Sequence, residues 1–403
     1  MKYVPIPISM LPVGKPLPVN VWNPDGVLLL RKGQPIVSEQ HREKLYDHNA
    51  STTEAEAQAW QRSYERMVHS MLQEGVDVEQ ISRMPMPSAI HERDFHANEQ
   101  LSGGWLDLQE VLRGILYQGG LAISPVARLA AIENKARKLL ADDPDDSLFS
   151  LFQALADSAL GYCSTHALLC AVGCELAAQK MGLDVHQRQT LMSAALTMNI
   201  GMAREQDVLA RQSTAPSEEQ RKLIGGHPEL SVQILRGYGI TDEAELDVVR
   251  WHHQPESPEA LERTLQLRLL LSMADVFVAM MAARRTREAL SPLESAKAIY
   301  LKQESDVTVA VGSALAASFG FYPPGTYVRL VGGETAVSVQ RGLRANTPWV
   351  IVVVDKNGIP TMNYQCLDTA LPAHAIAAPI AFTTRKVVIN AERVRRAREK
   401  IRR

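Results

Sequence analysis

The spacing of apolar residues divides the chain into a long helical middle and two ends that carry strand and turn signals. From about residue 107 to 320, apolar residues recur every three to four positions, which predicts a succession of helices. Start and stop signals such as Ser124-Pro125 and Gly182 separate the segments. The predicted helices begin at residue 125, cover the apolar segment 148–181, and then occupy 187–198, 217–238, 241–253, 258–284, 292–303 and 306–319.

The N-terminal part has a different pattern. Residues 1–50 are interpreted as a small β-rich domain, because short apolar runs alternate with turn residues such as Asp25-Gly26. Residues 51–106 are interpreted as one helix, Thr53 to Glu74, followed by a linker.

Strand and turn signals return near Tyr322. Apolar runs at 327–330, 335–339 and 349–354 are separated by glycine-containing turns, so 321–390 is predicted to be a small β region. Residues 391–403 are predicted to form a basic helical tail. The expected fold is therefore mainly α, with a helical domain over 107–320 flanked by small β regions.

Charge argues against a general attraction to polyanions. The 403 residues carry a formal net charge of −2, so the molecule as a whole offers no field for nucleic acid or an anionic membrane. The tail is an exception, with seven basic and two acidic residues. Such a tail can bind nucleic acid, lipid or an acidic partner, but we favour a solvated, frayed terminus. The acidic cluster Asp142 to Asp146 is likewise interpreted as a solvated helix junction.

Cysteine usage and the N-terminus favour the cytoplasm. Three of four cysteines, Cys163, Cys170 and Cys174, share one apolar helical segment and are expected in the core of a protein in a reducing compartment. Prolines interrupt the N-terminus where a signal peptide needs an apolar run. We see no apolar run of roughly 18 residues or more and expect no membrane span.

Five ligand-type residues follow one another along the helical region. Imidazole and carboxylate groups bind zinc, manganese or iron, and ligands from several helices can converge in a bundle core. Each histidine alone is by default a core or surface residue, so the order of the set carries the hypothesis. The candidate metal ligands are His166, His227, His252, His253 and Asp275.

Their sequence contexts resemble the HD-GYP family of bacterial cyclic-di-GMP phosphodiesterases over about residues 120 to 360. The similar segments, in order, are STHALLCAVGCELAAQKMGL, GGHPELSVQIL, VVRWHHQ, LRLLLSMADVFVAMMAARRTREALSP and YPPGTYVRLVGGETAVSV. The resemblance implies an HD-domain helical bundle, cyclic-di-GMP signalling, metal binding at the five ligands and ligand binding at Arg268, Arg284 and Arg287.

The chain departs from the family where catalysis is expected. The family's His-Asp dyad lies in a stretch that usually reads HDIGK, whereas this chain reads MNIGM, with Met198 and Asn199 at the dyad positions. The Gly-Tyr-Pro motif is replaced by QPESPEALERTLQ. Tyr162 stands where some members have a further acidic ligand.

These substitutions change what the site can hold. The dyad aspartate of the family bridges two metals, and a neutral amide at Asn199 cannot balance two dications. The thioether of Met198 is too soft a ligand for such ions. We therefore expect no two-metal centre, no assignable catalytic residue, and either no cofactor or one transition metal ion (zinc, manganese or iron) on the remaining histidines.

Three functions remain open. The first is a catalytically inactive pseudo-enzyme that acts through a protein partner or by sensing cyclic-di-GMP, with Arg284 and Arg287 as phosphate-binding candidates. The second is a metal-dependent phosphodiesterase with a reduced site on His227, His252 and His253. The third is a scaffold that binds through its β regions and tail.

Overall fold

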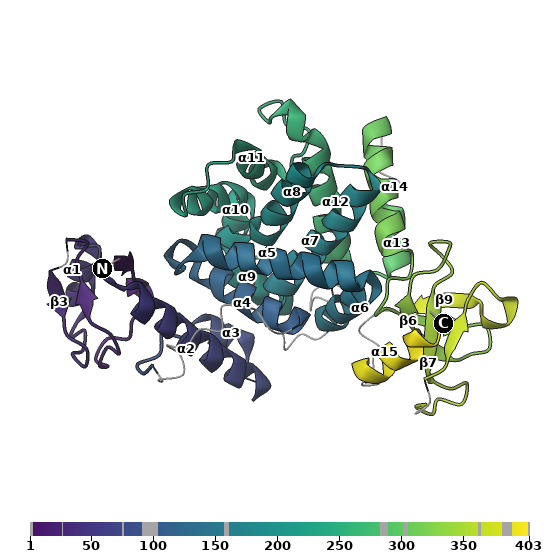
Figure 1. Ribbon diagram of the computed structural model, residues 1–403, viewed down its shortest axis with the longest axis horizontal. Helices are drawn as coiled ribbons and strands as arrows, with labels where there is room; N and C mark the ends of the chain where they lie inside the picture. Colours follow the sequence, from purple (N-terminus) through teal and green to yellow (C-terminus); the bar gives the residue numbers. More distant parts are fainter. Residues whose placement is uncertain are drawn as a thin grey trace. The chain divides into compact units, whose positions relative to one another are not determined.

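The computed structural model describes residues 3–25, 27–74, 76–90, 104–156, 161–282, 289–300, 305–361, 364–380 and 389–401. The chain divides into two compact units, Met1–Ile132 and Glu133–Arg403 (Figure 1). Helices predominate, and the described residues form a small antiparallel sheet in each unit. The predicted mainly α fold with small β regions is therefore confirmed, while the predicted domain start at residue 107 lies inside the first unit.

The first unit packs a helix against a four-stranded sheet. The strand order is β1-β4-β2-β3. Helix α2 matches the predicted helix and begins where the Thr53 hydroxyl accepts the Glu56 amide. Trp60 and Tyr64 of α2 are fully buried in the core of this unit. Its elements are β1 (Tyr3–Pro5), β2 (Val21–Trp22), β3 (Leu28–Leu30), α1 (Glu39–Asp47), β4 (Ser51–Thr53), α2 (Glu54–Gln73), α3 (Val78–Ser82) and α4 (Trp105–Gln118).

The predicted β-hairpin is present. Strands β2 and β3 pair antiparallel, with Val21 opposite Leu30. Gly26, part of the predicted turn, lies outside the described residues.

The second unit is built around one buried helix, α7. All of its residues except Gln179 and Lys180 are buried, because α6, α8, α12 and α14 all pack against it. Gly173 allows the closest approach, since a Cβ there would lie 2.3 Å from the Phe319 ring of α14. The helices are α5 (Pro125–Asp142, which crosses the boundary between units), α6 (Pro144–Leu155), α7 (Cys163–Lys180), α8 (Val185–Thr197), α9 (Ala203–Arg211), α10 (Glu218–Gly237), α11 (Glu243–Trp251), α12 (Leu265–Met281), α13 (Pro292–Tyr300) and α14 (Asp306–Phe319).

Three details of the helical prediction were wrong. The apolar segment 148–181 is two helices, since α6 ends at Leu155 and α7 begins at Cys163. Helix α9 was not predicted. The segment 258–284 becomes α-helical only at Leu265, after a short 3-10 turn.

One stretch of this unit passes a simple test for a membrane span. Glu262–Met281 is long and apolar enough by length and composition, although no such stretch was expected. Because 56% of that window is buried inside the protein, and α12 packs on α7 and α14, this is a core helix of the bundle.

A five-stranded antiparallel sheet follows the bundle. Its order is β8-β7-β6-β5-β9, and Val337, Val339 and Ile351 form part of its core with Phe149 of α6. The strands are β5 (Tyr327–Leu330), β6 (Thr335–Gln340), β7 (Trp349–Val354), β8 (Cys366–Asp368) and β9 (Ile376–Ile380).

The basic tail folds as α15 (Ala391–Glu399), which Figure 1 shows near the C-terminus. Acidic residues hold this helix in place. Arg398 is 2.7 Å from Asp143, and its side chain is only 3% exposed. Arg395 pairs with Asp146 at 3.2 Å. Val394 of the same helix is buried in the core of the sheet. We interpreted the tail as frayed and the acidic junction as solvated. Both interpretations were wrong, because arginines of the tail form ion pairs with aspartates of the junction.

Candidate functional site

The bundle brings all five predicted ligands into two adjacent clusters. The three-histidine cluster consists of His227 from α10 and His252 and His253, which follow α11. The Asp275 cluster consists of His166 and Cys170 from α7 and Asp275 from α12. Within each cluster the ligand atoms lie within 4.8 Å of one another.

The two clusters meet at Asp275. Its Oδ1 is 2.7 Å from His166 Nε2, and its Oδ2 is 3.9 Å from His253 Nδ1. Burial alone raises the pKa of Asp275, but the hydrogen bond from His166 and the nearby histidines lower it below its ordinary value. Asp275 is therefore an ionised carboxylate that faces both clusters.

Backbone carbonyls fix the proton on two of the three histidines. Pro228 has no N–H to donate to the carbonyl of Ile224, and this carbonyl instead accepts His227 Nδ1–H at 2.7 Å. At the end of α11 the carbonyl of Val249 accepts His252 Nδ1–H at 2.7 Å. Since a carbonyl only accepts, both protons are on Nδ1 and both Nε2 atoms present a lone pair.

These two lone pairs face each other. His227 Nε2 and His252 Nε2 are 3.3 Å apart. Burial lowers the pKa of His227 to about 4, and burial with the neighbouring His253 lowers that of His252 to about 3. Neither ring carries a second proton near pH 7, so no hydrogen bond joins them. The contact is unfavourable unless a cation accepts both lone pairs.

The geometry of the cluster fits one metal ion. Two nitrogens bound tetrahedrally at about 2.05 Å to one zinc ion stand roughly 3.3 Å apart. His253 offers a third nitrogen, and its side chain is 44% exposed. Three imidazoles with one open position are a recognised zinc arrangement. The three-histidine cluster therefore has the donor set for a single transition metal ion.

The Asp275 cluster is satisfied without a metal. The Tyr162 hydroxyl can donate to His166 Nδ1 at 2.9 Å, which leaves His166 Nε2–H to donate to Asp275. Burial and the charge of Asp275 raise the pKa of the Cys170 thiol well above its usual range, so this sulfur stays protonated. His166 and Asp275 are therefore paired by a hydrogen bond, whereas the facing Nε2 lone pairs of His227 and His252 have no donor between them.

The loop that carries the dyad positions packs on α10 beside His227. A Cβ at Gly201 would lie 2.8 Å from the carbonyl oxygen of His227, and Ser231 donates to the carbonyl of Met198 at 2.8 Å. Met198 is fully buried. Among the described residues, the Asn199 side-chain oxygen is buried without a hydrogen-bond partner. The loop is thus near the metal-type ligands but supplies no charged group.

Arg268 is buried and bonded to groups of the protein itself. It is 2% exposed and donates to the carbonyl of Pro255 and to Asp247, each at 2.7 Å, as well as to the carbonyl of Leu261. Arg284 and Arg287, the other predicted ligand-binding residues, lie outside the described residues.

An open cavity of about 800 Å³ lies beside the three-histidine cluster and is lined in part by His253. Acidic side chains predominate in it: Glu229, Glu243, Asp247 and Glu259 against Arg250. Arg250 already pairs with Glu229 at 2.8 Å. Among the described lining residues, therefore, no unpaired cation faces this space to meet a phosphate.

Comparisons with known proteins identify no family. No protein-family profile and no curated protein matches the chain. A similar solved structure is Bd1817, a HDG"Y"P protein from Bdellovibrio bacteriovorus, with 18% sequence identity and a TM-score of 0.39. The match covers 78% of this chain and 99% of that chain.

Two residues of the site were missed as partners of His166. Tyr162 was considered only as a substituted acid and Cys170 only as a core residue. With His166 they are spaced four residues apart on one helix, which places all three side chains on one face. This spacing can be read from the sequence and would have indicated that Tyr162 and Cys170 lie beside His166.

A buried carboxyl at the start of α11 predicts a pH effect on stability. Burial and the carboxylates of Glu133 and Asp242 raise the pKa of Glu245 to about 8. Its stability contribution is full below the unfolded pKa of about 4.5 and is lost as the pH rises through 8. We expect Glu245→Gln to raise Tm at pH 9 by roughly 5 °C, with a smaller gain at pH 6, in scanning calorimetry.

Glu243→Gln provides the control, since Glu243 is exposed on the same turn. A Tm that is unchanged at pH 9 in Glu245→Gln would contradict the raised pKa.

Proposed function

We propose that this chain is an HD-GYP-like cytoplasmic signalling protein of bacteria that binds one transition metal ion and does not hydrolyse cyclic-di-GMP. The observation that carries the proposal is the difference between the two clusters. The pair His227 and His252 needs a cation between its lone pairs, whereas His166 and Asp275 satisfy each other. Two-metal hydrolysis requires both clusters to bind metal.

The metal in this proposal has a structural role. A bound ion supplies positive charge that joins α10 to the end of α11 through His227 and His252. Neutral imidazoles with fixed Nδ1 protons are already oriented for that role. Asp275 adds a negative charge at the edge of the cluster. The output would then be a contact with a partner protein.

Protein contact is favoured over nucleotide sensing by the charge of the cavity. Cyclic-di-GMP carries two phosphates, and the described lining residues are mainly carboxylates. Cyclic-di-GMP stays a candidate ligand only through Arg284 and Arg287.

A second candidate function is a metal-dependent phosphodiesterase with the reduced site. The observation that favours it is the exposure of His253 to the cavity, because substrate can reach an ion held there.

Restoring the dyad tests the proposal. The wild type is expected to yield no linear dinucleotide from cyclic-di-GMP with added zinc, manganese or iron. The double variant Met198→His/Asn199→Asp is expected to bind about two ions per chain instead of about one, because an imidazole and a carboxylate return at the dyad positions, on the loop that packs beside His227. Product chromatography and elemental analysis give the two readouts.

The outcomes separate the candidates. Linear product from the wild type that disappears in His253→Ala would establish the phosphodiesterase instead. A double variant that folds but still binds one ion would show that the missing dyad is not what limits metal binding.

A further inference from the structure

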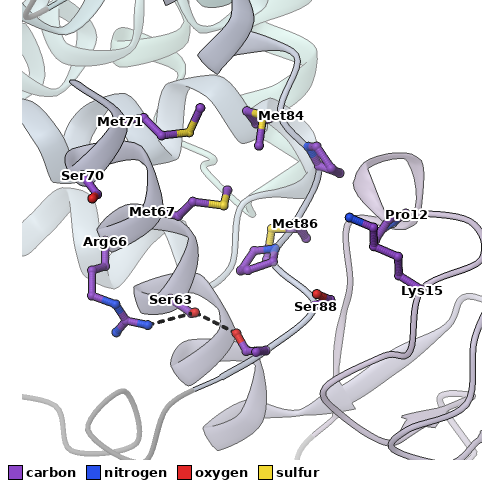
Figure 2. Close-up of a pocket in the computed structure, with 13 residues that line it drawn as sticks. Pro12, Lys15, Ser63, Arg66, Met67, Ser70, Met71, Met84, Met86 and Ser88 are labelled. Atoms are coloured by element: carbon purple, nitrogen blue, oxygen red, sulfur yellow. Dashed lines mark hydrogen bonds between the residues drawn. The ribbon is translucent and has the colours of Figure 1, made fainter. Parts of the chain in front are cut away.

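A groove in the first unit combines a methionine lining with positive charge. It has a volume of about 530 Å³ and lies between α2 and the non-helical residues 84–89 (Figure 2). Met67 and Met71 line it from α2, and Met84 and Met86 line it from the opposite wall. The spacing of four places Met67 and Met71 on one face of the helix.

Hydrogen bonds hold the second wall in place. Trp60 Nε1 donates to the carbonyl of Pro87 at 2.7 Å, and the Ser63 hydroxyl donates to the carbonyl of Ala89 at 2.9 Å. The Met86 amide donates to the carbonyl of Met10 at 2.8 Å. The groove is therefore formed before anything binds, which lowers the entropy loss on binding.

The charged residues that the structure describes along this groove are both cations. The described lining residues include Lys15 and Arg66 and no carboxylate. Figure 2 shows Arg66 and Lys15 on opposite sides of the view, with the methionine sulfurs between them. Lys15 is exposed, and Arg66 donates to the Ser63 hydroxyl. An apolar strip with a cation on each border is complementary to an apolar strip with acids on each border.

We propose that this methionine groove binds an acidic amphipathic helix of a partner protein. Flexible thioether side chains adapt to varied apolar surfaces, and helix-in-groove docking is a common mode of recognition. A helix with carboxylates on both sides of its apolar stripe meets Lys15 and Arg66 together. A fatty acid, with one head group, would meet only one of them.

The test uses the full-length protein and a labelled peptide. The peptide has leucines at positions i, i+3, i+4 and i+7 of each repeat and glutamates elsewhere, and a matched peptide has lysines in place of the glutamates. Fluorescence anisotropy is expected to show binding of the glutamate peptide only. Lys15→Glu is expected to weaken binding about tenfold. Met67→Gln/Met71→Gln is expected to weaken it at least as much.

Matched controls are Lys32→Glu, an exposed lysine of the same unit, and Met181→Gln, a methionine outside the groove; neither should change binding. Methyl NMR of labelled methionines gives a second readout that does not depend on variants. The Met67, Met71 and Met84 methyl signals should shift on adding the glutamate peptide. Three results would overturn the proposal. The lysine peptide could bind as well as the glutamate peptide, or the groove variants could bind the glutamate peptide as tightly as the wild type does. The glutamate peptide could also neither bind nor shift a methionine methyl signal.

Discussion

His252→Ala is expected to abolish metal binding, from about one transition metal ion per chain to none. His252 is fully buried, and its Nε2 lone pair faces that of His227, so its loss removes one of the two inward ligands. A ligand whose free concentration is about a thousand times its Kd stabilises the fold by about 4 kcal/mol. The Tm should therefore fall when the ion is lost. Elemental analysis of protein purified without chelator or affinity metal measures the content.

Two other histidine variants serve as comparisons. His186→Ala changes an exposed histidine outside both clusters and should keep the ion. His166→Ala alters only the Asp275 cluster and should also keep it. A wild type without metal would remove the basis of the proposed structural role. Loss of metal in His166→Ala would show that the two clusters bind as one.

Asp247→Asn is expected to destabilise the second unit by about 3–5 kcal/mol, because it leaves a buried guanidinium without its counter-ion. Asp247 and Arg268 are 2.7 Å apart, with side chains 8% and 3% exposed. The same carboxylate accepts the Leu261 amide, so the pair also fixes the turn before α12. Urea unfolding followed by circular dichroism measures the change in the free energy of unfolding.

The exposed pair Arg236 and Glu243 gives the contrast. Both side chains are about half exposed, so Glu243→Gln should change the free energy of unfolding by less than about 1 kcal/mol. The double variant Asp247→Leu/Arg268→Met should recover part of the loss, because no charge is then left buried. A loss below 1 kcal/mol in Asp247→Asn would mean that solvent reaches Arg268.

Much of the helical unit could be predicted because its periodic pattern is local. The ranges of α8, α10 and α14 follow from apolar spacing, and in the structure Ser217 and Ser305 cap α10 and α14. The break between α6 and α7 was missed because both helices are apolar, and periodicity does not show where two buried helices separate. Docking of α15 was missed because it depends on distant carboxylates.

The candidate metal ligands could be named from the sequence, but their protonation and hydrogen bonding could not. Motif order pointed to His227, His252 and Asp275, and the structure brings these residues together. Which nitrogen carries each proton depends on the carbonyls of Ile224 and Val249, whose positions follow from a proline and a helix end. Only the folded arrangement separates a cluster that needs a cation from one that does not.

The ion pair between Asp143 and Arg398 joins residues 255 positions apart, and this has a consequence for synthesis on the ribosome. The acidic start of α6 emerges long before the arginines of α15 that neutralise it. At about 5–20 residues per second, the interval is roughly 10–50 seconds. During that time the aspartates repel one another and the Phe149 side of α6 lacks its covering sheet. The second unit therefore completes its folding late, only after the arginines of α15 have emerged.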